Sequence, residues 1–319
     1  MLKLIVKRLI NMIPTLLVVA TIVFIITRLI PGDPAAVMLG PQASVEDIAK
    51  LRDKLGLNEP IIMQYLHYLG DLVRGDLGTS LSYNQPVLSI IMERFPNTLL
   101  LSVCALLIAL VIGIPAGIVS ATRQYSFLDY ALMILALIGV SMPIFWLGVM
   151  LVLFFSVELG WFPATGMGSL ADGFGTFLKH LVLPSFALST VSMATFARIT
   201  RSSMLEVIKQ DYIKTARAKG LRESIVVWKH ALKNALTPLL TVIGMQISMM
   251  LGGAVLTETI FSWPGMGRLV VDAIDKRDFV VVQGTVLFIA VIFVLVNLVV
   301  DILYQVVNPR VNMDKKGGE

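Results

Sequence analysis

The stretch Thr98-Leu-Leu-Leu-Ser-Val-Cys-Ala-Leu-Leu-Ile-Ala-Leu-Val-Ile-Gly-Ile-Pro-Ala-Gly-Ile-Val119 carries no charged side chain. About 20 apolar residues in a helix cross the hydrocarbon core of a bilayer, so this stretch is long enough to span a membrane. Similar stretches occur along the whole chain, and the spans predicted from them are Leu9–Ile30, Thr98–Val119, Tyr130–Val157, Leu181–Ile199, Pro238–Thr257 and Thr285–Val307.

The composition supports the same fold class. Of the 319 residues 56% are hydrophobic and 15% are charged, well outside the range of soluble domains. We therefore expect an all-α membrane protein with six transmembrane helices. No small-residue cleavage site follows Leu9–Ile30, so this segment is predicted to be a retained span. The single cysteine, Cys104, excludes a disulfide within the chain.

The distribution of Lys and Arg predicts the orientation in the membrane. With both termini in the cytoplasm, the segments on that side hold 16 of these residues, and the two short segments on the opposite side hold 4. The cytoplasmic segments are 1–8, 120–129, 198–237 and 308–319, and the short outer ones are 158–180 and 258–284. Short loops that stay in the cytoplasm are enriched in Lys and Arg. The net charge of +5 then reflects this bias, and no nucleic-acid partner is expected.

Four ranges follow from these spans. We expect a cytoplasmic N-terminus with the first helix (1–30), an extracytoplasmic helical segment (31–97), a five-helix core (98–307) and a cytoplasmic tail (308–319). In the outer segment, apolar residues at helical spacing predict helices over Val45–Leu55 and Ile61–Leu72, with Gly56 and Gly75 after their ends.

The most polar segment inside the core is 200–237. Its periodicity predicts a first short helix with an apolar face of Leu205, Ile208, Tyr212 and Ala216, and a second with Ile225, Trp228, Leu232 and Ala235. Gly220 separates the two helices and suits a turn with positive φ. The second helix is predicted to end at Pro238. We expect this helix-turn-helix to contact a partner protein in the aqueous phase.

This segment resembles the EAA loop of the inner-membrane permease subunits of binding-protein-dependent ABC importers, in the group for dipeptides, oligopeptides, nickel and glutathione. The EAA pattern of that family falls on Lys214, Thr215, Ala216 and Gly220, with its first Glu and first Ala replaced. The residues that the resemblance places in the ATPase-coupling loop are Asp211, Tyr212, Lys214, Thr215, Ala216, Gly220 and Leu221.

The resemblance extends along nearly the whole chain. Its other motifs are Ile13-Pro-Thr15, Pro31-Gly-Asp-Pro34, Leu55-Gly-Leu57, Gly75-Asp-Leu-Gly78, Ala197-Arg-Ile-Thr-Arg-Ser-Ser203, Glu258-Thr-Ile-Phe-Ser-Trp-Pro-Gly265 and Asn308-Pro-Arg310. It implies a type I ABC importer permease fold in a bacterial cytoplasmic membrane. The implied partners are a second homologous permease subunit, two ABC ATPase subunits and an extracytoplasmic substrate-binding protein, with no cofactor.

The sequence is consistent with a separate source of energy. It contains no G-x-x-x-x-G-K-[ST] phosphate-binding loop, so ATPase activity is assigned to the partners and the chain is not expected to be an enzyme. A secondary transporter is an alternative, but ion-coupled carriers need ionisable groups inside their spans. The six spans hold none in their interiors. A membrane enzyme is disfavoured because no catalytic or metal-ligand cluster is evident.

Polar residues in the fourth and fifth spans are candidates for the translocation path. They are Ser189, Ser192, Gln246 and Ser248. Helix packing through small residues explains the same composition, so both interpretations stay open. The predicted cargo is a small peptide, with glutathione included, and a nickel complex is the alternative within the same group.

Overall fold

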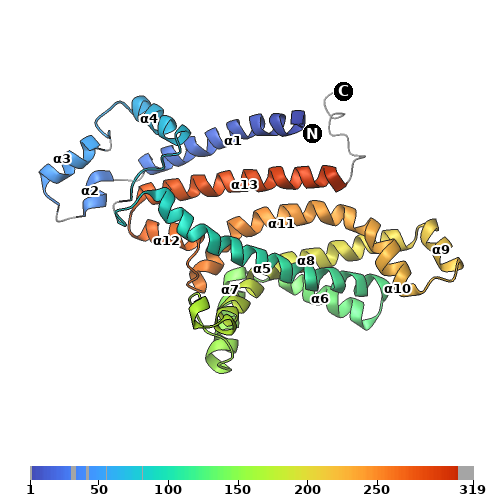
Figure 1. Cartoon of the computed structure of the whole chain (residues 1–319). Helices are drawn as coiled ribbons and strands as arrows, with labels where there is room; N and C mark the ends of the chain where they lie inside the picture. The colour runs from blue at the N-terminus through green and yellow to red at the C-terminus, as the bar shows by residue number, and fades with distance from the viewer. Residues whose placement is uncertain (1, 30–33, 41–42, 55, 81, 308–319) are drawn as a thin grey trace. The chain divides into compact units, whose positions relative to one another are not determined.

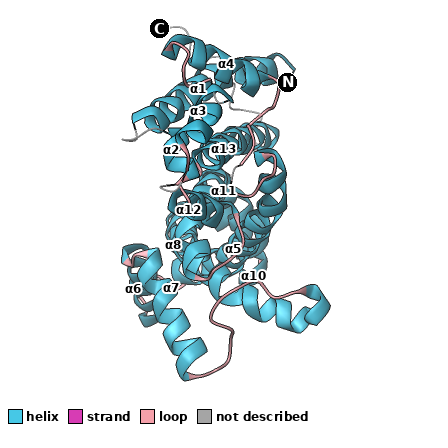
Figure 2. Ribbon diagram, turned by 90° about the vertical axis from the view of Figure 1, so that its left-hand side faces the viewer, coloured by secondary structure: helices cyan, strands magenta, loops and turns pink. Residues whose placement is uncertain are grey.

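The computed structural model describes residues 2–29, 34–40, 43–54, 56–80 and 82–307, and these residues are helices and loops without a strand (Figures 1 and 2). The predicted tail 308–319 lies outside them. The helices of the first third are α1 (Leu2–Leu29), α2 (Pro34–Leu39), α3 (Val45–Lys54), α4 (Ile61–Val73) and the start of α5 (Val87–Thr122). Those that follow are α6 (Phe127–Ser141), α7 (Ile144–Leu151), η1 (Val152–Glu158), η2 (Leu170–Asp172), α8 (Phe174–Ile208), α9 (Asp211–Ala218), α10 (Glu223–Ile225), η3 (Val226–Ala231), α11 (Leu232–Ile260), α12 (Met266–Asp275) and α13 (Phe279–Val307).

Four helices are long and apolar enough to cross a membrane without interruption, namely α1, α5, α8 and α13. Two bent pairs meet the same test, which gives six spans if each pair crosses once. The predicted all-α membrane fold is thus confirmed.

The third span differs from its prediction. The stretch Tyr130–Val157 is not one helix, because α6 and the segment of α7 and η1 meet at an angle of 106°. Met142 has ψ of 129° and Pro143 has ψ of 133°, so both leave the helical region. A proline disfavours helical geometry in the residue before it and has no N–H to donate. Hydropathy alone does not detect this change of direction.

The chain divides into two compact units. Unit 1 contains Met1–Thr98 and Pro264–Val294, and unit 2 contains Leu99–Trp263 and Leu295–Glu319. This grouping cuts across the four ranges expected from the sequence, because Pro264–Val294 packs with the N-terminal third rather than with the core helices.

Unit 1 contains the predicted outer helices. Helices α3 and α4 agree with Val45–Leu55 and Ile61–Leu72 to within a residue at each described end, and Gly56 and Gly75 have φ of +62° and +78°. Helix α4 packs on α1 through the ring of Phe24, which contacts Tyr65 and Tyr68. A second contact joins the segment before α5 to the start of α13, where buried Asp278 accepts a hydrogen bond from Ser80 of 2.6 Å.

Unit 2 is organised around α8, which contacts α6, α7 and α11. Helix α5 also approaches α8 closely, at Gly113 and Gly117. A Cβ atom at either glycine would lie 2.5 Å from a backbone oxygen of α8, that of Met193 or that of Ala197. Two glycines four residues apart let helices in lipid come into backbone contact. Helix α8 is longer than the predicted span Leu181–Ile199 at both ends.

Candidate functional site

The segment 200–237 forms a protruding turn between α8 and α11 (Figure 1). Two details of its prediction were wrong. The first helix does not run from Leu205 to Ala216, because α8 ends at Ile208 and Gln210 is extended, with ψ of 150°, before α9 begins. The second does not end at Pro238, which lies inside α11. Buried Ala235 and Leu239 flank this proline, and such packing offsets the hydrogen bond that a proline removes.

Gly220 ends α9 with the predicted left-handed turn. Its φ is +76°, its N–H donates to the carbonyl of Arg217 at 2.9 Å, and the N–H of Leu221 donates to Ala216. This pair of hydrogen bonds is typical of a helix that ends at a glycine with positive φ. A Cβ atom at Gly220 would meet nothing within 4 Å. Glycine is therefore needed here for its backbone conformation and not for space.

The inner face of the turn is buried against the ends of the long helices. Ile213 of α9 is fully buried and Ala216 nearly so. They belong to one apolar cluster with residues from α5, α8, η3 and α11, namely Ile118, Ala121, Met204, Val226, Val227, Ala231 and Ala235. Helix α9 is therefore in apolar contact with the ends of α5, α8 and α11.

The outer face of the turn is apolar and exposed. We call Tyr212, Leu221, Ile225 and Trp228 the outer face; Tyr212 is 43% exposed and Trp228 is 55% exposed. Asn234 donates a hydrogen bond of 2.6 Å to the hydroxyl of Tyr212 and holds that ring on the surface. The prediction of one shared apolar face for the second helix was wrong, since Ile225 and Trp228 are exposed while Ala235 is buried. The cause is η3, a π-helix, which shifts the periodicity assumed for an α-helix.

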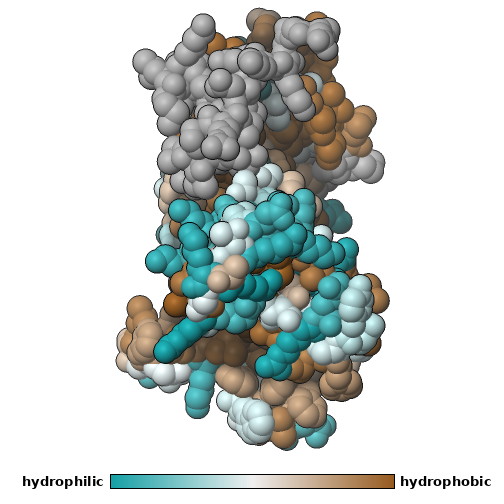
Figure 3. All heavy atoms as spheres, turned by 90° about the vertical axis from the view of Figure 1, so that its right-hand side faces the viewer, coloured by the Kyte–Doolittle hydropathy of each residue, from teal (hydrophilic) through white to brown (hydrophobic). Residues whose placement is uncertain are grey.

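Charged side chains surround this outer face, and hydrophilic side chains gather on this side of the molecule (Figure 3). Asp211 starts α9, pairs with Lys214 at 2.8 Å, and its carbonyl accepts from the hydroxyl of Thr215. Arg217 donates two hydrogen bonds to Glu223, of 3.0 and 2.6 Å, across the Gly220 turn. These bonds raise the pKa of Arg217 above its ordinary value. Glu223 was not among the residues predicted for this loop.

A buried ion pair lies in unit 2, where α6 contacts α8. Arg201 of α8 donates to both carboxylate oxygens of Asp129, at 2.7 and 2.8 Å. Asp129 is 1% exposed and also accepts hydrogen bonds from the Ser120 hydroxyl and from the N–H of Tyr125. The pair joins the α5–α6 turn to α8. Arg201 lies in one of the family motifs, but Asp129 lies one residue outside the predicted third span and was not considered.

The four translocation-path candidates are buried within unit 2. The hydroxyl of Ser192 in α8 donates to the Gln246 side chain in α11 at 2.8 Å, and Ser189 donates to the carbonyl of Phe186. Ser248 is buried as well. This geometry favours the packing interpretation, and a role in the path stays a prediction.

The described ranges contain no group of three His, Cys, Asp or Glu residues placed to hold a metal ion. The residues of the outer face form instead an exposed apolar surface around the Gly220 turn. Of the predicted loop residues, Asp211, Tyr212, Lys214, Thr215 and Leu221 are exposed, Ala216 is buried, and Gly220 makes the turn.

Comparison with known proteins identifies the family. Residues 113–313 match the binding-protein-dependent transport system inner membrane component, and residues 1–102 match the N-terminal part of such components. The chain belongs to this family. It is a permease subunit of an ABC importer, and the expected inner-membrane class is confirmed at that level.

Several relatives match almost the full length of the chain. A dipeptide transport system permease protein of Alkalihalophilus pseudofirmus is 49% identical, over 96% of this chain and 98% of its own. An oligopeptide transport system permease protein of Bacillus subtilis is 45% identical, with the same coverage. A glutathione transport system permease protein of Salmonella choleraesuis is 43% identical, over 98% of this chain and 99% of its own.

Solved structures agree with the fold. An inward-facing MetNI methionine ABC transporter superposes with a TM-score of 0.56 at 19% identity, over 69% of this chain and 97% of that one. An amino acid ABC transporter gives a TM-score of 0.51 at 15% identity, over 70% of this chain and 94% of that one. At such identities the likeness shows the fold alone, and it confirms the predicted permease fold.

Proposed function

We propose that this permease imports small peptides and that the turn between α8 and α11 is the surface on which an ATPase subunit docks. The main support for this proposal is that the turn has one exposed face and one buried face. Its outer face is apolar, aromatic and exposed, whereas its inner face is buried against the ends of α5, α8 and α11. A partner that binds the outer face moves the long helices through contacts that already exist.

The peptide cargo is supported by the relatives with nearly complete coverage. Their names specify dipeptides, oligopeptides and glutathione, which is itself a small peptide. Selection among these cargos is assigned to the extracytoplasmic binding protein, which delivers the peptide to the permease.

The mechanism we propose is alternating access driven by partner subunits. Two ATPase subunits close on ATP, and each presses on the helix-Gly-helix turn of one of two homologous permeases. The apolar cluster under α9 carries that displacement to α5, α8 and α11, and the Asp129–Arg201 pair carries it to α6. The peptide path then opens to one side of the membrane at a time.

The orientation follows from the charge asymmetry, with both termini and the segment 200–237 in the cytoplasm and 31–97 outside. Ser82 and Ser224 are exposed, so a cysteine at either position reports its side of the membrane. In a Cys104→Ala background, an impermeant thiol reagent on intact spheroplasts is expected to label Ser82→Cys and to leave Ser224→Cys unlabelled until the cells are opened. The reverse labelling would contradict the orientation.

Reconstitution tests the proposed function. Proteoliposomes containing this chain, its companion permease and two ATPase subunits, with the binding protein supplied outside, are expected to accumulate a labelled dipeptide when ATP is inside. Omission of the ATPases or of the binding protein should abolish uptake. Uptake driven by a proton or sodium gradient without ATPases would instead establish a secondary transporter.

A further inference from the structure

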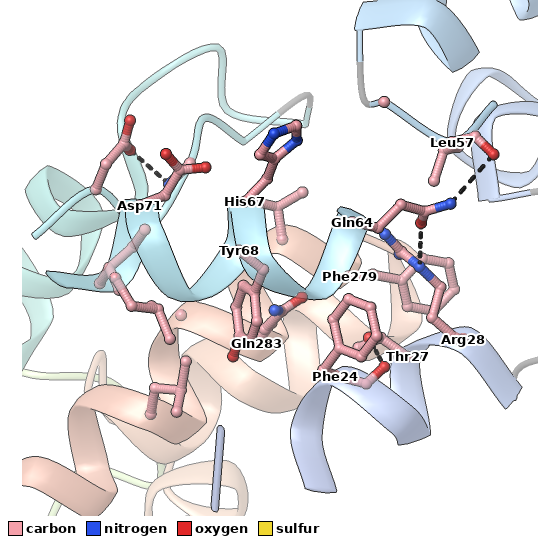
Figure 4. Close-up of a pocket in the computed structure, with 18 of the residues that line it drawn as sticks. Phe24, Thr27, Arg28, Leu57, Gln64, His67, Tyr68, Asp71, Phe279 and Gln283 are labelled. Carbon is pink, nitrogen blue, oxygen red and sulfur yellow. Dashed lines mark hydrogen bonds between the residues drawn. The ribbon is translucent and has the colours of Figure 1, made fainter. Parts of the chain in front are cut away.

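Unit 1 contains a cavity of about 240 Å³ between α1, α4 and the start of α13 (Figure 4). Arg28 is the last residue but one of α1, and Phe279, Gln283 and Leu287 lie in the first three turns of α13. Both helices are membrane spans, and the cavity lies at the end of each. It is therefore at the boundary between hydrocarbon and water, on the side of the segment that follows α1.

One wall of the cavity carries a partly buried cation. The Nε–H of Arg28 donates to the side-chain oxygen of Gln64 at 3.0 Å, and its guanidinium lies 5.1 Å from the ring centroid of Phe24 (Figure 4). Among the described residues no carboxylate forms an ion pair with Arg28. The other N–H groups of the guanidinium can donate two parallel hydrogen bonds to a phosphate or a carboxylate.

Another part of the cavity lining is acidic. Glu59 pairs with His67 at 3.0 Å, and Asp71 approaches Arg74 more loosely, at 3.8 Å. One turn of α4, about 5 Å, separates Gln64 from His67, so the acidic part begins close to Arg28. Carboxylates accept hydrogen bonds from a primary ammonium. A ligand that binds both the Arg28 guanidinium and a carboxylate of the lining needs an anionic group and an amine. A short zwitterion carries both, a few bonds apart.

The surroundings favour a lipid over a free solute. Phe24, Phe279 and Leu287 give the cavity apolar and aromatic walls. On α1 the neighbouring Ile22, Ile25 and Ile26 are exposed, which provides an apolar surface for hydrocarbon chains. We propose that this cavity binds the headgroup of an amine-bearing phospholipid such as phosphatidylethanolamine, with the phosphate on Arg28 and the ammonium at Glu59.

The test uses the whole complex of both permeases and the ATPases in nanodiscs. Native mass spectrometry after gentle release counts the lipids retained in discs of phosphatidylethanolamine, phosphatidylcholine or phosphatidylglycerol. Phosphatidylethanolamine should be retained in preference to the other two. Arg28→Gln should lower its affinity about tenfold, which is about 1.4 kcal/mol. Arg277→Gln is the matched control, since Arg277 is an exposed arginine of the same unit and is not among the residues that line the cavity.

A second variant separates binding from folding. Glu59→Gln changes an exposed residue, and it should remove the preference for phosphatidylethanolamine over phosphatidylcholine while protein abundance stays normal. Equal retention of phosphatidylethanolamine by the wild type and Arg28→Gln would overturn the proposal. So would Arg28-dependent binding of a labelled dipeptide to the same complex without the binding protein, because the site would then belong to a free zwitterion.

Discussion

Two arginine–carboxylate pairs in unit 2 have nearly the same geometry and very different surroundings. In Asp129–Arg201 the carboxylate side chain is 2% exposed and the arginine 26%, whereas in Arg217–Glu223 the carboxylate is 59% exposed and the arginine 39%. Both pairs make two hydrogen bonds. The buried pair joins α6 to α8, whereas the exposed pair lies on the surface of the Gly220 turn.

Two glycines show the same contrast. At Gly117 a Cβ atom would lie 2.5 Å from the oxygen of Ala197, whereas at Gly220 it would meet nothing within 4 Å. Gly117 is required by contact between helices and Gly220 by a positive φ. Substitutions where α5 and α6 pack on α8 should therefore lower the stability and the amount of the protein. Substitutions in the Gly220 turn should instead lower peptide uptake.

The largest effect is expected for Arg201→Gln. It leaves the Asp129 carboxylate buried without its cation, and breaking a buried pair in this way costs about 3–5 kcal/mol. The amount of protein in the membrane and its thermal stability in detergent should both fall severely. Arg198→Gln, three residues earlier in α8 at an exposed position, is the matched control and should be near normal. A normal amount of stable Arg201→Gln protein would show that the pair does not hold α6 to α8.

The next effect is expected for Gly117→Ala. One added methyl group must displace α5 from α8, and overpacking of this kind costs about 1–3 kcal/mol. The thermal midpoint of the purified complex should fall. Gly70→Ala in α4 is the control, because the space around Gly70 is open and alanine favours a helix. If both variants behave alike, the close approach of α5 to α8 is not a stabilising contact.

The packed membrane spans and the Gly220 turn were predictable from the sequence to different degrees. The spans were found because runs of apolar residues report burial in lipid directly. The turn at Gly220 was found because lysines followed by glycine are typical of a helix end. The partner of Arg201 was missed because Asp129 is 72 positions away, and no local pattern joins them. Trp228 and Ala235 were predicted to share one helix face and do not, because the π-helix η3 has a different period from the assumed α-helix.

The smallest effect is expected for Arg217→Gln. Exposed ion pairs contribute about 0–1 kcal/mol, so stability should hardly change. Peptide uptake should fall a few-fold, because α9 and α10 lose their connection across the turn. The exchanged double variant Arg217→Glu with Glu223→Arg should restore most of the uptake in proteoliposomes. Failure of that exchange, with stability unchanged, would mean that one of these charges contacts a partner directly.

We propose that the turn at Gly220 transmits movement to the long helices and does not merely end α9. Gly220→Leu places a bulky residue at φ of +76°, which costs about 1–2 kcal/mol, and Gly75→Leu imposes the same strain at φ of +78° in equally open space in unit 1. The deciding measurement is ATP-dependent uptake and cargo-stimulated ATP hydrolysis in proteoliposomes containing equal amounts of each variant. The Gly220 variant is expected to lose both activities, and the Gly75 variant is expected to retain them. Normal activity of the Gly220 variant, or equal losses in the two variants, would contradict this proposal.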